Sequence, residues 1–299
     1  MGTRIREAAF AGSWYPADAA ACEREIRRFL SGGADDGPGT GGALVGAVVP
    51  HAGWFYSGRI ACRTIERLRR GADPEPDGIV VFGMHLPPGA PNVLMAEGAW
   101  ETPFGPLPVA EDLAAELRAR LPFRVESPAR AAPDNTIELQ LPFLKYFYPA
   151  VRILPLGVPP TEGALGLAAE VAAAARRLGM RIQVLGSTDL THYGPNYGRL
   201  DHGRGAAAVD WVRRENDRRF IEALCALDPR RVIAEALAHE NACCPGAAAA
   251  ALEAGRRLGA RRADVVGYAT SYDRQPADSF VGYVGVVFGS AAEGAGNKG

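Results

Sequence analysis

The chain has 299 residues, of which 47% are hydrophobic and 22% are charged, the proportions of a globular protein long enough to bury a sizeable core. Its formal net charge is −1 with both signs interspersed, which gives no electrostatic footprint for nucleic acid or an anionic membrane, so we expect neither partner. The N-terminal segment has no apolar stretch behind its charges, and no run approaches about eighteen apolar residues, so we expect a cytoplasmic protein.

Apolar periodicity predicts strands that alternate with helices along the chain. We expect strands at 44–49, 79–82, 151–157, 182–185, 264–268 and 280–288, and helices at 20–30, 60–69, 111–120, 137–147, 165–178, 206–224, 229–238 and 246–258. The Gly/Asp/Pro-rich segment 32–42 is expected to be a loop, and the last strand an antiparallel edge. This order predicts an α/β fold, a single-domain layered sandwich over 1–290 with a mainly parallel central sheet covered by helices, followed by a disordered tail over 291–299.

Three of the five histidines closely follow predicted strands. His51 follows VVP, His85 follows VVFGM and His192 follows VLGSTDLT. Because the carboxyl ends of parallel strands share one edge of a sheet, these imidazoles are expected to meet there. A single histidine in such a place is more often a hydrogen-bonded structural residue, but imidazole is also the commonest metal ligand. Three in corresponding positions favour a metal site.

Asp189 stands three residues before His192 in the segment GSTDLTHYG. If the chain turns there into a helix or a single helical turn, this spacing places both side chains on one face. Three roles are then open to Asp189: it could bind the metal, orient an imidazole, or cap the turn without any chemistry.

The five cysteines are an odd number with no framework spacing, so we expect free thiols in a reducing compartment. Cys243 and Cys244 precede a helix that is expected to begin near Pro245. A thiol at a helix N-terminus is stabilised as the thiolate, the form that binds metal, although two buried thiols are an equally good interpretation. Since adjacent side chains are not expected to point the same way, one of the two at most is expected to be a ligand. A His/His/Cys set can hold zinc, copper or iron.

Six segments occur in a characteristic order, namely REAAFAGSWYPAD, VVPHAGWFYSG, WETPFGPLPV, NTIELQLPFL, GSTDLTHYG and DSFVGYVG. Together they cover nearly the whole chain and resemble the Memo family, which in bacteria is called AmmeMemoRadiSam system protein B. The Memo fold is similar to that of the class III extradiol ring-cleaving dioxygenases, whose non-heme Fe(II) activates O2 beside a bound catechol.

The resemblance implies roles for five side chains. It places the metal ligands at His51, His85 and Cys244. It also makes Asp189 and His192 a polar pair beside the metal, with His192 at the position of the acid/base in the ring-cleaving enzymes.

Three departures from the family pattern bear on the site. The family usually has a Gly-Pro-(Asn or Ser)-His turn at its second histidine, where this chain has FGMH. Asn135, in the segment Asp134-Asn135-Thr136, stands where relatives carry a histidine. Pro245 replaces the usual glycine after the ligand cysteine, which leaves Cys243 as the alternative ligand.

The first functional hypothesis is a non-heme Fe(II) dioxygenase that uses O2 to oxidise or cleave a small catechol-like aromatic substrate. In it, His192 accepts a phenolic proton, Asp189 orients His192, and Asn135 donates a hydrogen bond to an oxygen ligand. The ring is expected to lie against the aromatic side chains of the segment that follows His51, which are Trp54, Phe55 and Tyr56.

Two alternatives remain. The second hypothesis is a non-catalytic or redox-active iron- or copper-binding protein, and a thiolate in place of the carboxylate expected of Fe(II) oxygenases favours it. The third is a zinc-dependent hydrolase, in which the same ligands and a water would attack a carbonyl. The identity of the substrate, the native metal and the oligomeric state stay open.

Overall fold

The computed structural model describes residues 4–31 and 42–291. The predicted loop at 32–42 and the predicted tail at 291–299 lie outside these ranges, except for residues 42 and 291.

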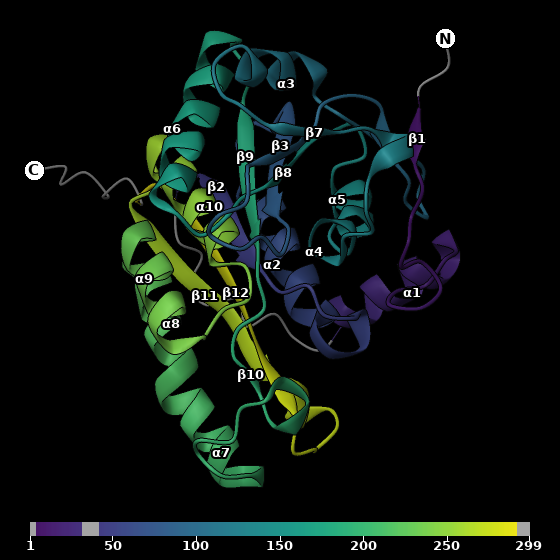
Figure 1. Ribbon diagram of the computed structural model, residues 1–299. Helices are drawn as coiled ribbons and strands as arrows, with labels where there is room; N and C mark the ends of the chain where they lie inside the picture. The colour runs from purple at the N-terminus through teal and green to yellow at the C-terminus, as the bar shows by residue number, and fades with distance from the viewer. Residues whose placement is uncertain (1–3, 32–41, 292–299) are drawn as a thin grey trace, which may run out of the picture.

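Strands and helices alternate through most of the described chain (Figure 1). The strands are β1 (Ile5–Arg6), β2 (Leu44–Val49), β3 (Gly78–Gly83), β4 (Val93–Met95), β5 (Ala99–Trp100), β6 (Leu107–Pro108), β7 (Arg124–Glu126), β8 (Arg152–Gly157), β9 (Ile182–Ser187), β10 (His192–Tyr193), β11 (Arg262–Thr270) and β12 (Phe280–Gly289). The α-helices are α1 (Ala19–Leu30), α2 (Arg59–Arg70), α3 (Glu111–Arg118), α4 (Asn135–Glu138), α5 (Leu141–Phe147), α6 (Glu162–Arg177), α7 (Gly205–Trp211), α8 (Asp217–Cys225), α9 (Pro229–His239) and α10 (Pro245–Arg257).

The main sheet is parallel at its centre, antiparallel at β12 and at the β8–β4 pair, and parallel again at the outer β4–β7 pair. Its order is β10-β12-β2-β9-β3-β8-β4-β7, with β11 also paired to β12. The pairs β2–β9, β9–β3 and β3–β8 are parallel, as predicted, whereas β12 is antiparallel to β2, β10 and β11. The expectation that the last strand forms an edge is wrong, because β12 lies inside the sheet, between β2 and the strands β10 and β11.

Helices cover both faces of this sheet (Figure 1). On one face, α2 packs against β2 and β12 and is itself covered by α1 and α5. On the other face, the Ala-rich α10 packs against β9, β2 and β3, with α6 and α9 outside it. Every residue of β3 and β9 is buried, which explains why these strands appear in the sequence as continuous apolar runs rather than alternating patterns. The predicted α/β layered sandwich is confirmed.

Two predicted helices differ in detail from the structure. The helix expected at 137–147 is divided into α4 and α5, and Pro142 near the start of α5 has no N–H to continue the hydrogen bonds of the preceding turn. The helix expected at 206–224 begins with α7, passes through a π-helical turn at Val212–Asn216 and continues as α8.

The short strands β1, β4, β5, β6, β7 and β10 were not expected, because two or three residues are too few to show a period. β1, β5 and β6 form a separate small sheet. Within the described ranges, no helix is both long enough and apolar enough to pass through a lipid bilayer.

Candidate metal centre

Three neighbouring strands of the sheet deliver side chains to one edge. The strands β2, β9 and β3 are adjacent and parallel. His51 lies two residues beyond the end of β2, Asp189 two beyond the end of β9, and His85 two beyond the end of β3. The N-terminus of α10 lies at the same edge, because Gly246 packs against the backbone just after the end of β8. This arrangement brings the two cysteines before α10 to the histidines.

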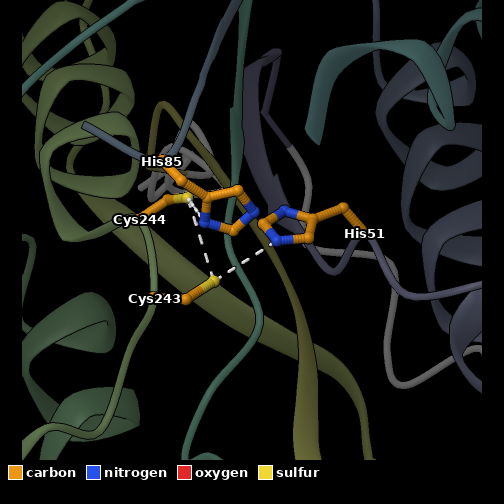
Figure 2. Close-up of side chains that lie close together, drawn as sticks. All are labelled: His51, His85, Cys243 and Cys244. Carbon is orange, nitrogen blue, oxygen red and sulfur yellow. Dashed lines mark hydrogen bonds between the residues drawn. The ribbon is translucent and has the colours of Figure 1, made fainter. Parts of the chain in front are cut away.

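His51, His85, Cys243 and Cys244 converge on one point (Figure 2). One ligand atom from each side chain lies within 4.8 Å of all the others. Cys243 Sγ is 3.3 Å from His51 Nε2, Cys244 Sγ is 3.2 Å from His85 Nδ1, and the two sulfurs are 3.8 Å apart. Two imidazoles and two thiols form a donor set typical of zinc, copper and iron sites, so the residues present fit a transition-metal ion.

Hydrogen bonds fix the orientation of His51. Ser187 Oγ donates to the Thr136 carbonyl at 2.6 Å, so its lone pairs are left to accept from His51 Nδ1, 3.0 Å away. In the neutral imidazole, the form that binds a metal, the proton therefore sits on Nδ1, and the lone pair of Nε2 faces the sulfur of Cys243. The backbone N–H of His51 donates to Asp189 Oδ1 at 2.7 Å, which holds the start of this loop in place.

His85 reaches the cluster through an unusual backbone turn. Met84, directly before it, has φ +68°, in the left-handed region that non-glycine residues rarely adopt. The N–H of Met84 donates to Thr136 Oγ1 at 2.6 Å, and this bond supports the turn. Strain of this kind costs on the order of 1–3 kcal/mol and tends to occur at functional sites. His85 is exposed and stands on the open side of the cluster, whereas His51 is buried.

The structure places both cysteines in the cluster, in contrast to our expectation that adjacent side chains would diverge. Cys244 is the N-cap of α10, with φ −130° and ψ 58°, and this bend is what turns the two sulfurs to the same side. The N–H of Cys243 donates to the Asp189 carbonyl, and that of Cys244 donates to Thr188 Oγ1. The loop after β9 therefore holds both residues by their backbone.

Burial and mutual charge shift the pKa values in the cluster. Burial alone lowers the pKa of His51, but the charges of Asp189 and Cys243 outweigh it and raise this pKa to about 9. Burial raises the pKa of Cys243, but the hydrogen bond from Cys244 and the charge on His51 outweigh it, and the pKa falls well below its ordinary value. Burial and the adjacent Cys243 raise the pKa of Cys244. The pKa values of His51 and Cys243 therefore shift in opposite directions, and each group stabilises the charged form of the other.

A cavity of about 640 Å³ opens beside the cluster. His51, His85 and Asn135 line it on one side, together with Asp189 and His192. The lining also contains aromatic side chains, which are Trp14, Phe55, Tyr56, Tyr197 and Tyr283, and small or polar residues, among them Ser13, Asn196, Ser271 and Ser279. A larger cavity of about 740 Å³ lies between α6, α9 and α10, but its lining is Arg- and Glu-rich and includes none of the cluster residues among those described.

Trp54 does not lie in the cavity, which corrects the prediction that it walls a substrate ring. It is buried in the core, stacked on Phe143 with 4.1 Å between ring centroids, and its Nε1 donates to the Leu139 carbonyl. The segment Trp54–Gly58 is π-helical, and this turn sends Trp54 inward while Phe55 and Tyr56 stay at the cavity.

Asp189 and His192 both line the cavity, but not on one face of a helix as predicted. The chain after β9 stays extended and enters β10, because Leu190 and Tyr193 bond to β12. The carboxylate of Asp189 is buried against His51, and burial raises its pKa. His192 is oriented instead by the Leu190 carbonyl, which accepts from Nδ1 at 3.0 Å. That bond leaves Nε2 of His192 free to accept a proton.

A buried polar network holds the strand that carries His192. Asp217 on α8 accepts from the backbone N–H of Thr191 at 3.0 Å, from its hydroxyl, and from the Tyr268 hydroxyl at 2.7 Å. Burial raises the pKa of Asp217 to about 6. Asp217 therefore holds Thr191, the residue directly before His192, by its backbone and its side chain.

Sequence reasoning missed the supporting residues Ser187, Thr136 and Asp217. Serine, threonine and aspartate are common after strands and in helix caps, so nothing in their spacing distinguishes them. Only the position of Ser187, two residues after the strand predicted at 182–185 and two before Asp189, could have pointed to it.

The fold and the cluster define an α/β protein with four His and Cys side chains at the carboxyl edge of its sheet that could hold a metal ion. The Memo-like protein family model matches residues 6–287, and the chain belongs to this family. Among its relatives, a MEMO1 family protein of Pyrococcus furiosus is 30% identical over 296 residues, covering 96% of this chain and 100% of the relative. Another, from Methanothermobacter thermautotrophicus, is 33% identical over 292 residues, covering 93% and 98%.

The fold also has a solved counterpart. The crystal structure of an uncharacterized protein from Escherichia coli K12 superimposes with a TM-score of 0.51 and 14% identity, covering 82% of this chain and 100% of that one. At this identity the likeness extends to the fold alone.

Proposed function

We propose that the protein is a metal-dependent oxidoreductase, a non-heme Fe(II) dioxygenase that uses O2 to oxidise or cleave a small catechol-like aromatic ring. The observation that carries the proposal is that His51 and His85 border the same 640 Å³ cavity as His192 and Asp189. A purely structural metal site is normally closed by its ligands, whereas a catalytic one stays open to substrate. Free thiols also fit the reducing conditions of the cytoplasm.

Each polar side chain of the cavity has a defined task in this reaction. When bound, Fe(II) supplies Lewis acidity toward the catechol oxygens and redox chemistry toward O2. His192 accepts a phenolic proton on Nε2 and later returns it to the ring-opened product. Asn135 Nδ2 already donates to the His51 carbonyl at 3.3 Å, and its second N–H can meet a substrate oxygen. Asp189 keeps His51 in place through the backbone.

The lining of the cavity suits an aromatic substrate without a negative charge. Its aromatic side chains offer ring faces and edges on which a single ring packs. Among the described lining residues there is no Lys or Arg, and the one carboxylate is Asp189. Arg274 lies over the ring of Phe55, 5.7 Å from its centroid, but is outside the lining. A carboxylate or phosphate on the substrate would therefore find no Lys or Arg among these residues to pair with.

Oxygen uptake tests the proposal directly. Protein purified without air and loaded with Fe(II) is expected to consume O2 with members of a catechol panel and to give a coloured ring-opened product that contains both oxygen atoms. Apo-protein, and protein loaded with zinc, serve as controls. If Fe(II) binds but no catechol in a broad panel causes oxygen uptake above the apo-protein, the proposal is wrong.

A second candidate function is a redox-active iron- or copper-binding protein without ring cleavage. The second sulfur in the cluster favours this candidate. Thiolates are soft ligands that suit copper(I) and zinc, whereas the usual Fe(II) oxygenase site has a carboxylate ligand instead. Tight copper binding in the protein as isolated, without oxygen uptake on catechols, would support this candidate. Hydrolysis of esters or amides without O2 would instead indicate a zinc-dependent hydrolase.

A further inference from the structure

The sulfur of Cys243 lies as well placed for an ion as that of Cys244. Each sulfur contacts a different imidazole, at 3.3 Å for Cys243 with His51 and 3.2 Å for Cys244 with His85. Both backbone N–H groups donate to the loop after β9, so the backbone of both residues is held beside the cluster. The two cysteines are therefore equivalent in their contacts with the histidines.

Three of the six separations among the four ligand atoms are close to those of a tetrahedron around one ion. With a metal–sulfur bond of about 2.3 Å, two sulfurs at tetrahedral corners are about 3.8 Å apart, and a sulfur and a nitrogen are about 3.5 Å apart. The sulfurs of Cys243 and Cys244 are 3.8 Å apart, and the two sulfur–nitrogen distances are 3.2 and 3.3 Å. The other three separations lie within 4.8 Å, so an ion bound by all four side chains would also draw the more distant atoms together, by up to about 1 Å.

We infer that Cys243 is a second sulfur ligand, so that the protein supplies the ion with two nitrogens and two sulfurs while its side toward the cavity that His51 and His85 line stays open. This inference rests on the metal centre of the proposed function, but not on its oxygen chemistry. Two thiolates select borderline and soft cations such as Zn²⁺, Fe²⁺ and Cu⁺ over hard cations such as Mg²⁺, which prefer oxygen ligands.

Cobalt(II) is the probe that counts the sulfurs. Each thiolate bound to Co²⁺ adds to a sulfur-to-metal absorption band in the near ultraviolet, so its intensity per bound ion reports the number of ligand cysteines. Reduced apo-protein is titrated with Co²⁺ without air, alongside Cys243→Ser and Cys244→Ser. Each single variant is expected to lose about half of the band per bound cobalt, and the double variant nearly all of it. Cys225→Ser, a half-buried thiol on α8, is the matched control and is expected to keep the full band.

A second measurement is independent of colour. Alkylation followed by mass spectrometry is expected to find Cys243 and Cys244 both protected when Zn²⁺ is bound and both reactive in the apo-protein, with thermal melting showing that the variants fold. A full cobalt band in Cys243→Ser, together with free alkylation of Cys243 in the zinc-loaded protein, would overturn the inference.

The outcomes separate this inference from the proposed function. Two bound sulfurs without oxygen uptake would support the inference and contradict the dioxygenase. Oxygen uptake with Cys244 as the one sulfur ligand would do the reverse.

Discussion

The hydroxyl oxygen of Ser187 lies 3.0 Å from Nδ1 of His51, and it donates its own hydrogen to the Thr136 carbonyl at 2.6 Å. Because the hydroxyl has its single hydrogen committed, it can only accept from the imidazole. One serine at the end of β9 thereby decides which nitrogen of His51 is free for a metal ion.

Ser187→Ala is expected to weaken metal binding by about 10- to 100-fold, because the imidazole loses the partner that sets its tautomer and ring angle. The measurement is a competition titration of Zn²⁺ or Fe(II) against a chelator of known affinity. Ser31→Ala, at the end of α1 and far along the chain from the cluster, makes the same chemical change and should leave the affinity at its wild-type value. Equal affinities in both variants would contradict the role assigned to Ser187.

His192→Ala is expected to keep the metal and to lose about 10²- to 10⁴-fold in turnover, the usual contribution of a positioned proton acceptor. His192 shares the cavity with the cluster but is not one of its four side chains. Metal content measured per protein and oxygen uptake separate the two effects. His239→Ala, on α9 beside Glu235, is the matched surface control. A variant that loses its metal would show that His192 serves as a ligand instead.

Gly246→Ala is expected to destabilise the protein by about 1–3 kcal/mol and to weaken metal binding at the same time. An added Cβ would lie 2.5 Å from the Val158 carbonyl oxygen and 2.6 Å from the Pro159 carbonyl, so the N-terminus of α10 and both cysteines must shift. Urea unfolding and metal titration measure the two losses.

Gly166→Ala in α6 is the control for Gly246→Ala, because an added Cβ meets nothing within 4 Å there. It is expected to raise stability by up to about 1 kcal/mol, since alanine loses less entropy than glycine in a helix. A similar loss of stability in both glycine variants would argue against a close approach of Gly246 to the backbone of Val158 and Pro159.

Asp217 is expected to make stability fall as the pH rises from about 4 to about 6. Its pKa is about 6 in the folded protein and 3.8 ordinarily, so in this window the folded state keeps a proton that the unfolded chain releases. The loss amounts to about 3 kcal/mol and is complete above about pH 6. Asp217→Asn removes this titration, although it also costs stability at every pH because its amide group faces donors.

The difference in unfolding free energy between wild type and Asp217→Asn, followed by urea titration from pH 4 to pH 7, isolates this carboxyl. The advantage of the wild type should shrink with rising pH across the window. Asp210→Asn on α7, whose carboxylate is exposed, is the surface control for the same chemical change. A constant difference for Asp217→Asn would show that its pKa is not raised.

Substrate charge is expected to matter at the cavity. Of three catechols that differ in one substituent, the neutral and the amine-bearing compounds should be used better than the carboxylate-bearing one, by about tenfold or more in kcat/KM at low salt. The physical reason is the lone carboxylate of Asp189 in a lining without Lys or Arg among the described residues. The expected preference for the neutral and amine-bearing catechols should weaken in high salt. A preference for the carboxylate-bearing catechol would contradict the prediction.

The central part of the fold could be predicted from the sequence because its strands are long apolar runs. β2 occupies the predicted residues, and β3, β8 and β9 differ by one or two residues at their ends. The order of strands could not be predicted, since nothing in the apolar pattern of β12 says which strands lie beside it. For the same reason its place inside the sheet was missed.

The candidate site was predictable where a ligand follows a strand. His51 and His85 come two residues after the strands that carry them, so the parallel sheet itself brings them together. Cys243 and Trp54 were misjudged because each depends on a local bend, the N-cap at Cys244 and the π-helical turn at Trp54–Gly58. Such bends arise from tertiary packing, which periodicity does not report. The metal that binds here stays a prediction.

The cluster also joins distant parts of the polypeptide. His51 and Cys243 are 192 positions apart along the chain, and His85 and Cys244 are 159 apart. An ion held by all four would act as a staple, since global unfolding must open both long loops and release it. At a free-ion concentration 100 times the dissociation constant, the gain is about 2.7 kcal/mol. The melting temperature would then depend on the supply of trace metal, and a chelator would lower the stability of the whole sheet.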